Sequence, residues 1–374
     1  MLAQSWLVYR LTHSAALLGE VGFASQIPVL FLGPVAGIFA DRHSRHRIVI
    51  ATQALMMMQA LAIATLTLAG KIQVWQIFLL AFFLGVCTAF DIPARQSFIV
   101  EMVGRDDLMN AIALNSSMFN AARSIGPAVA GILVAALGEG LCFLLNGLSF
   151  LAVIAGLLMM KITSAPKRTD ERRMEQLKEG FRYASGNPAI RSLLLLLGGV
   201  SLLGMSYAVL MPIVADQVLH SGARGLGELL TSAGIGALLG ALSLAHRQRV
   251  QGLDRVVAWA ASGFGMSLVV FSFSRTHWFS MCTLVMAGFC LMVQLGSTNT
   301  LIQSIVSDQM RGRVMGIYSM MFLGMAPFGS LIAGFMAHHF TAPVAILGCG
   351  IASIAGGLTF HLYRPRLRID SRLT

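Results

Sequence analysis

Eleven apolar runs separated by short polar loops constrain this chain more than any other feature of its sequence. A helix needs about 20 apolar residues to cross the hydrocarbon core of a membrane. Soluble domains carry about 25% charged residues, whereas this chain of 374 residues has 11% charged and 56% hydrophobic residues. The sequence therefore predicts an all-α polytopic membrane protein. The runs lie at residues 15–40, 47–69, 74–98, 108–137, 140–161, 190–215, 226–246, 255–274, 276–303, 313–338 and 342–363.

A basic loop between the first two runs sets the orientation of the chain. Arg42, Arg45 and Arg47 come directly after the run that ends at Ala40. Lys and Arg gather in the cytoplasmic loops of membrane proteins, and alternating the runs across the membrane brings most other Lys and Arg to the same side. We expect a multi-pass protein of the bacterial inner (plasma) membrane, surrounded by lipid, with a cytoplasmic C-terminus. Loop cations also account for the net charge of +11, so no nucleic-acid partner is predicted.

A polar stretch near the middle divides the chain into two halves. Within it Met174, Leu177 and Phe181 are at helical spacing, which is typical of a short amphipathic helix on a membrane surface. Residues 1–12 have the composition of the second half of a span, so we expect eleven full spans plus a partial first span. The predicted parts are an N-terminal six-span half with an incomplete first span at 1–161, a cytoplasmic linker at 162–189, a C-terminal six-span half at 190–363 and a basic cytoplasmic tail at 364–374.

Two short motifs each occur twice in the chain. Leu17–Glu20, which opens the second span, recurs as Gly225–Glu228, 208 residues later. Ile125–Gly131, in the fifth span, recurs more loosely as Phe328–Gly334, 203 residues later. Nearly equal offsets indicate a duplicated bundle of six plus six helices. Internal repeats of this kind are typical of secondary transporters, which rock one half against the other around a central site.

Several motifs resemble those of the major facilitator superfamily, and within it the branch of bacterial exporters that contains the enterobactin exporter and macrolide efflux proteins. In the basic loop, Gly37 is followed four residues later by the pair Asp41-Arg42 and then by further basic residues. The resemblance covers essentially the whole chain, although family members begin some tens of residues earlier, so we expect a misplaced start or a truncated product. It implies a major-facilitator-type six-plus-six helix bundle that exports a small molecule. The other stretches that carry it are Trp6–Thr12, Phe90–Gln96, Asn110–Ser116 and Arg311–Gly316.

The resemblance also implies an inner gate at the basic loop. In the family the matching loop contacts the eleventh span when the cavity faces outward, which here would bring Asp41 near Arg313. Asp91 and Arg95 lie four residues apart on one helix face, and we expect this pair to support the same network. Alternatively, the loop only orients the chain and its charges are solvated, or the pair contacts substrate. The predicted inner-gate residues are Gly37, Asp41, Arg42, Arg45, Asp91, Arg95 and Arg313.

Arg123 lies deep inside an apolar run, about 24 Å from Asp107 at a rise of 1.5 Å per residue. An arginine at this depth is costly and marks a functional site by default. Asn115 and Asn120 lie within the same broad helix face. We therefore predict that this face lines the substrate cavity and that Arg123 binds an anionic or phenolate group, or the acid that carries the proton. The alternative is a buried ion pair that fixes packing.

Glu20 and Glu228 occupy equivalent positions in the two repeats. A desolvated carboxylate takes up a proton more readily than a solvated one, so Glu20 is a candidate for proton coupling. Alternatively, it is a solvated acid at a helix start, where the helix dipole favours negative charge.

Gly126, Pro127 and Gly131 resemble a fifth-span motif that is common in antiporters. Proline frees a backbone carbonyl and bends a helix, while glycines allow neighbouring helices to approach closely. The motif predicts a pliable helix and favours export over import.

Together these features predict a secondary active transporter that exports a small amphipathic molecule, such as a siderophore or a drug, by proton antiport with alternating access. We expect a monomer without a cofactor or a metal site, driven by the proton gradient, because the sequence has no Walker-type glycine loop. The alternative is a non-transporting receptor or an inactive truncated scaffold of the same fold. An enzyme is not predicted, because the HExxH and GxSxG motifs are missing.

Overall fold

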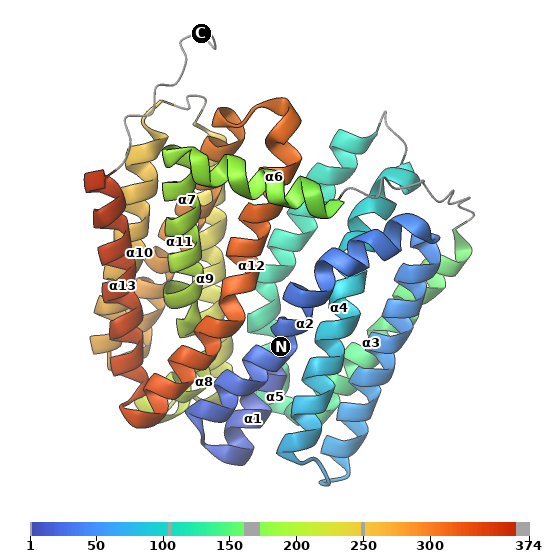
Figure 1. Cartoon of the computed structure of the whole chain (residues 1–374). Coiled ribbons are helices and arrows are strands. Elements are labelled where there is room, and N and C mark those ends of the chain that lie inside the picture. The colour runs from blue at the N-terminus through green and yellow to red at the C-terminus, as the bar shows by residue number, and fades with distance from the viewer. Residues whose placement is uncertain (1, 104–106, 161–172, 248–250, 364–374) are drawn as a thin grey trace.

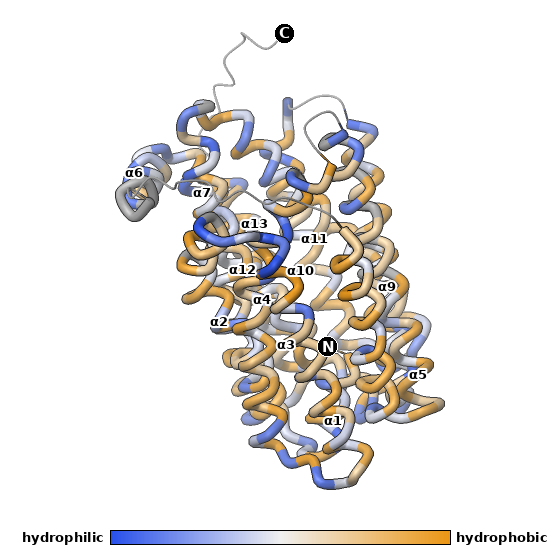
Figure 2. Tube along the Cα trace, turned by 90° about the vertical axis from the view of Figure 1, so that its right-hand side faces the viewer, coloured by the Kyte–Doolittle hydropathy of each residue, from blue (hydrophilic) through white to orange (hydrophobic). Residues whose placement is uncertain are grey.

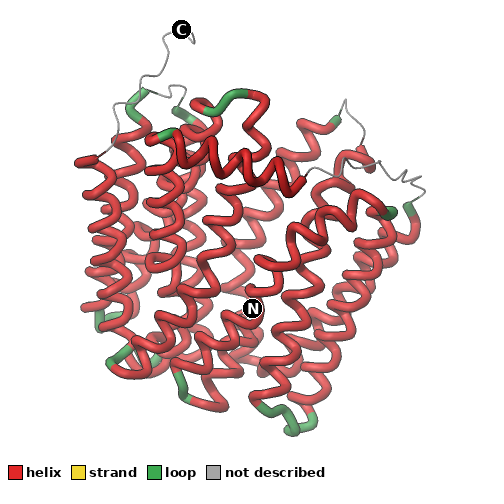
Figure 3. The backbone as a smooth tube through the Cα atoms, viewed as in Figure 1, coloured by secondary structure: helices red, strands yellow, loops and turns green. Residues whose placement is uncertain are grey.

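The computed structural model of the chain describes residues 2–103, 107–160, 173–247 and 251–363. In this part of the chain the regular elements are helices, and strands are absent (Figure 1, Figure 3). Two bundles stand side by side. The first holds α1 (Leu2–Thr12), α2 (Ala15–Arg42), α3 (Arg45–Leu68), α4 (Val74–Val103) and α5 (Leu108–Met159). The second holds α7 (Pro188–Gly199), α8 (Met211–Ile213), α9 (Gly222–Ala245), α10 (Leu253–Phe273), α11 (His277–Ile305), α12 (Asp308–His339) and α13 (Ala342–Tyr363).

Helix α5 contains two predicted spans that reverse at Gly138. This glycine has φ 80° and ψ 168°, a conformation that only glycine adopts readily. Just after this glycine, a Cβ on Gly140 would lie against Leu68, which is the last residue of α3. Near the end of α5, the Leu157 carbonyl oxygen lies 2.7 Å from the Nε2 atom of His46, in the first turn of α3. The chain after Gly138 therefore runs back along α3. Ten segments in the described residues are long and apolar enough to span a membrane, and that at 125–159 includes this reversal.

The seventh span, predicted as one run at 190–215, is an interrupted helix. Asn187 caps the start of α7 by accepting hydrogen bonds from the backbone N–H groups of Ala189 and Ile190, at 3.0 and 3.3 Å. After Gly199 the chain forms a π turn, the 3-10 segment η2 (Met205–Leu210), α8, and a second π turn, η3 (Val214–Val218). Pro212 lacks a backbone donor, and π turns often occur at functional sites.

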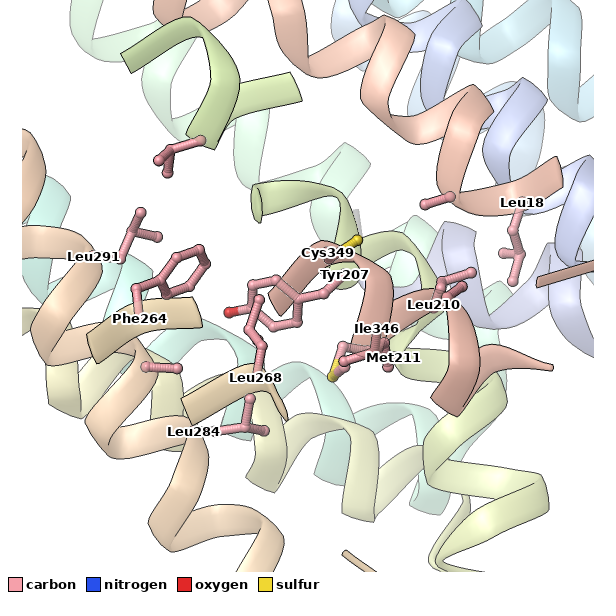
Figure 4. Close-up of a cluster of buried hydrophobic side chains, with 14 of the residues drawn as sticks. Leu18, Tyr207, Leu210, Met211, Phe264, Leu268, Leu284, Leu291, Ile346 and Cys349 are labelled. Carbon is pink, nitrogen blue, oxygen red and sulfur yellow. The ribbon is translucent and has the colours of Figure 1, made fainter. Parts of the chain in front are cut away.

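Apolar side chains fill the interior of the second bundle. Figure 4 shows Phe264, Leu268 and Tyr207 among them, all buried. Leu18 of α2 belongs to the same buried cluster as Leu210, so the apolar core continues from the second bundle into the first. Hydrophilic residues gather toward the ends of the helices, with apolar residues between them, as expected for a protein surrounded by lipid (Figure 2).

Helix α6 (Arg173–Gly186) lies across one end of the molecule (Figure 1). A Cβ on its Gly180 would lie 2.9 Å from the Cβ of Arg313, so α6 packs directly on the first turns of α12. Residues 170–172 of the predicted amphipathic helix lie outside the described residues. We call the end of the molecule that carries α6 and the α2–α3 turn the α6 end. The end that carries the α1–α2 and α12–α13 turns is the opposite end.

Candidate functional site: the contact between the two bundles

Two glycine crossings join the bundles near the opposite end. At the first, between α2 and α12, a Cβ on Gly19 would lie 2.6 Å from the Ser330 carbonyl oxygen and 3.1 Å from the Cα of Gly334. At the second, between α5 and α9, a Cβ on Gly131 would lie 2.7 Å from the Cα of Gly227. Real side chains do not approach a backbone this closely, so both crossings require glycine on each helix.

The two crossings are copies of each other. Gly19 and Gly227 belong to one of the repeated sequence motifs, and Gly131 and Gly334 belong to the other. Each crossing packs a copy of the first motif against a copy of the second, contributed by the other bundle. The internal repeat therefore marks the surface on which the halves meet.

A hydrogen bond between the bundles lies beside these crossings. Tyr9 of α1, which is 1% exposed, donates its hydroxyl proton to the Asp216 carboxylate of η3 at 2.7 Å. The Tyr9 ring also meets the His13 ring edge-on, with centroids 5.2 Å apart. Because one partner comes from each bundle, the bond breaks if the bundles separate at this end.

Toward the α6 end the bundles diverge. The α2–α12 contact extends to Leu30, whose Cδ1 atom would lie 2.5 Å from a Cβ on Gly324. Beyond it, a Cβ on Gly33, Gly312 or Gly316 would meet no atom within 4 Å. A cavity of about 220 Å³ lies between α2, α4 and α12 at this level. The same change occurs along α5, because Gly131 is tightly packed while a Cβ on Gly126 would point into open space.

Four of the predicted inner-gate residues, Asp91, Arg95, Arg45 and Arg313, form ion pairs within their own bundle or with α6. Asp91, 7% exposed, accepts hydrogen bonds from Thr52 at 2.8 Å and Gln53 at 3.0 Å and forms an ion pair with Arg95 at 2.9 Å. This carboxylate is fully occupied inside the first bundle. Arg45 is buried and forms an ion pair with Glu101 at the ends of α3 and α4.

Arg313 forms an ion pair with Glu179 of α6. Among the other predicted gate residues, Gly37 lies half-buried in α2, and Arg42 is exposed at its end. The side chain of Asp41 lies outside the described residues, so the contact implied by the resemblance is not part of the structure described here.

The predicted cavity residues are only partly described. Asn115 is exposed on α5, whereas the side chains of Asn120 and Arg123 lie outside the described residues. Glu20 is exposed and lines a pocket of about 370 Å³ with Ile332 and Phe335 of α12.

Glu228 has partners within the second bundle. Its carboxylate forms an ion pair with Arg224 at 3.0 Å, and the Nε2 atom of His277 lies 2.8 Å from it. The backbone stays helical at Pro127, since the non-helical residue within α5 is Gly138. The described residues contain no cluster of His, Cys, Asp and Glu suited to a metal ion.

Comparison with known proteins identifies the family. The transmembrane secretion effector family matches residues 1–371. The chain belongs to this family of major facilitator transporters. Two solved structures share the fold. One is the nucleoside transporter NupG, with a TM-score of 0.74 and 14% identity; the alignment covers 96% of this chain and 92% of the NupG chain. A bacterial homologue of the human lysosomal transporter Spinster, inward-facing and unoccupied, has TM-score 0.70 and 16% identity and covers 96% and 90%.

Curated relatives align over nearly the whole chain. The Staphyloferrin A transporter of Staphylococcus aureus is 27% identical and covers 98% of this chain and 92% of its own length. The multidrug efflux pump Tap of Mycolicibacterium fortuitum is 24% identical, with 98% and 92% covered. The enterobactin exporter EntS of Shigella boydii is 24% identical, with 96% and 86% covered. These relatives are transporters and not enzymes.

Sequence reasoning missed the partners Tyr9 and Asp216 of this transporter. Tyr9 stands in an apolar stretch and Asp216 at the end of another, 207 residues apart. Tyr9 falls within the family-like stretch Trp6–Thr12, but nothing in that stretch indicates a partner in the second half of the chain. One signal was available in the sequence. Residues 192–215 contain no charged residue, and Asp216 follows them directly. An acid at such a position is a candidate for a specific partner.

Proposed function

We propose that this transporter exports a small amphipathic molecule of the siderophore or drug class from the cytoplasm by proton antiport with alternating access. The names of the Staphyloferrin A transporter, Tap and EntS support this substrate class. The excess of Lys and Arg in the loops at the α6 end supports a cytoplasmic α6 end and C-terminus in the bacterial inner membrane.

The observation that carries the proposal is the difference between the two ends of the bundle contact. Glycine crossings bring the backbones together at the opposite end, while a Cβ on Gly33, Gly126, Gly312 or Gly316, toward the α6 end, would meet no atom within 4 Å. This is the geometry expected of a state that is closed outward and open inward. Export requires the reverse state as well, in which both crossings and the Tyr9–Asp216 bond have separated.

The proposed coupling step concerns two carboxylates near the outer end, Asp216 and Glu20. As a carboxylate, Asp216 accepts a charge-assisted hydrogen bond from Tyr9, and such bonds are roughly twice as strong as neutral ones. Once the outer side has opened and this bond is broken, Asp216 takes up a proton from outside. The charge-assisted bond to Tyr9 re-forms only when that proton leaves Asp216, and antiport requires that it leaves toward the cytoplasm as the bundles return to the inward-open state. Glu20, which is exposed beside the α2–α12 crossing, is the second candidate for the proton carrier.

Efflux measurements test the proposal. Cells that express the chain are loaded with a panel of siderophores and hydrophobic dyes, with and without a protonophore. We expect export of at least one compound, and we expect the protonophore to stop it. Export that persists without a proton gradient contradicts antiport. If the protein inserts but moves none of the panel, the non-transporting receptor or inactive scaffold becomes the better interpretation.

Proteoliposomes with an imposed pH difference separate the two carboxylates. Asp216→Asn is expected to abolish the stimulation of transport by the gradient. Glu20→Gln, beside the α2–α12 crossing, is the matched variant and is expected to retain it. Stimulation that survives Asp216→Asn but is lost in Glu20→Gln would assign the proton to Glu20.

A further inference from the structure

A basin of about 710 Å³ opens at the opposite end of the molecule, over the second bundle. It is formed by the α1–α2 turn, η3, the turn after α10 and the α12–α13 turn, whose ends meet at the lower edge of Figure 1. Neither the inner gate nor the cavity predicted on α5 contributes to it. The basic residues that line it are His13, His220, Arg275 and His338.

The charge of this basin is unusual for its position. Outward-facing loops of inner-membrane proteins are poor in Lys and Arg, yet three of the nine histidines in the chain and one arginine gather here. No acidic residue is among those that line the basin. The nearby Asp216 carboxylate accepts the Tyr9 hydrogen bond instead. The lining is therefore suited to an anion.

Two of the histidines are held by equivalent turns. His13 follows α1 and His220 follows η3, and both have φ 49°, in the left-handed region that non-glycine residues seldom adopt. They lie 207 residues apart, close to the offsets of the two repeated motifs. The same turn in each half thus carries an imidazole to the same basin.

Arg275 comes from a third turn, directly after α10. Its Nη1 atom donates to the carbonyl oxygens of Ser272 and Ser274, at 3.4 and 3.2 Å. These bonds hold the guanidinium at the rim, and a guanidinium has five N–H donors in all.

The size and the apolar part of the lining define the ligand further. Phe273, Phe340 and Val344 also line the basin. Its volume is in the range of about 300–1,000 Å³ that holds small organic ligands, far more than a phosphate or chloride ion fills. Gln217 and Thr341 add polar groups beside the cations.

We propose that this basin binds an amphipathic organic anion with carboxylate groups from the outer side. Arg275 supplies a permanent charge, and the three histidines add ring nitrogens that can donate hydrogen bonds to carboxylate oxygens. The other titratable groups near the histidines are Tyr9 beside His13, Asp216 and Arg224 four residues to either side of His220, and His339 next to His338. The proposal goes beyond transport and does not depend on which molecule is exported.

Calorimetric titration of the purified full-length protein in detergent tests this site. The probe is benzene-1,2,4-tricarboxylate, with inorganic phosphate as the small-anion comparison. We expect one tricarboxylate to bind per chain, and at least tenfold weaker phosphate binding. Phosphate binding as tight as the tricarboxylate, or no tricarboxylate binding, would overturn the proposal.

Variants locate the binding. Arg275→Gln combined with His338→Gln is expected to weaken tricarboxylate binding at least tenfold, whereas His339→Gln, the exposed neighbour outside the basin, leaves it unchanged. His13→Asn with His220→Asn gives an independent check, because asparagine tolerates the left-handed backbone. Gel filtration shows that each variant is folded. Undiminished binding in both double variants would assign the anion to another part of the protein. Calorimetry measures binding and not transport, so this result does not depend on the outcome of the export assay.

Discussion

The two ends of the bundle contact are held together by different forces. At the opposite end, backbones pack directly on each other through Gly19, Gly334, Gly131 and Gly227, with one hydrogen bond between bundles beside them. At the α6 end, ion pairs such as those of Asp91 and Arg313 connect partners within one bundle or with the linker helix. Closure at the opposite end thus depends on steric fit. The charges at the other end stabilise each bundle and leave the contact between bundles open.

The largest effect is expected from filling a glycine crossing. In Gly131→Val the new side chain overlaps the backbone of α9, where even a Cβ would lie 2.7 Å from Gly227. We expect export to fall at least tenfold, and a cysteine placed at Ala130 to become reactive to a membrane-impermeant thiol reagent added outside. Gly126→Val is the matched control, since a Cβ there meets nothing within 4 Å. Equal loss in both variants would show that the crossing is not what closes this end.

The next effect is expected at the α6 end, in the stability of the first bundle. Asp91→Ala removes the acceptor of the Thr52 and Gln53 bonds and leaves two buried donors without it, and each such group costs roughly 1–3 kcal/mol. We expect a lower temperature of thermal unfolding in detergent, without greater labelling from outside. Asp254→Ala, at the start of α10, serves as the comparison in the second bundle. A variant as stable as the parent would mean that the network contributes little.

Removing the hydrogen bond between bundles is expected to shift the conformational balance. Hydrogen bonds to charged groups contribute about 1.5–3 kcal/mol, so Tyr9→Phe should raise the outward-open population by about tenfold or more. Distances between spin labels on the outer ends of α2 and α9 would report this shift. Tyr318→Phe is the control, because Tyr318 donates to Leu295 within its own bundle. Unchanged distance distributions in Tyr9→Phe would leave the glycine crossings as the sole closing force.

The smallest effect is expected from the exposed ion pair between Glu179 and Arg313. Pairs of this kind contribute about 0.2–1 kcal/mol. In Glu179→Gln we expect faster hydrogen exchange in α6, by up to fivefold at low salt, and a smaller difference at high salt. Lys178→Gln, on the adjacent position, is the control. If exchange in α6 is unaffected, packing through Gly180 is sufficient to hold the linker helix.

The sequence predicted the helical membrane fold, and its repeated motifs turned out to contain all four crossing glycines. Local patterns were also sufficient for Asp91 and Arg95, because residues four apart on a helix are neighbours. The partners of Tyr9 and Arg313 could not be predicted, since they lie 207 and 134 residues away in the chain. Their pairing depends on how the bundles and the linker dock, which no periodicity encodes. The reversal at Gly138 and the interruption of the seventh span likewise depend on single backbone conformations.

The irregular seventh span also gives this transporter an element of adjustable length. A 3-10 helix rises about 2.0 Å per residue and an α-helix 1.5 Å. Conversion of the six residues of η2 to α-helix would therefore shorten the span by about 3 Å. Asp216 lies six residues beyond this segment and would move with it, farther than its 2.7 Å bond to Tyr9 can stretch. A change in helix type in the middle of this span can thus release the contact between the bundles at the opposite end.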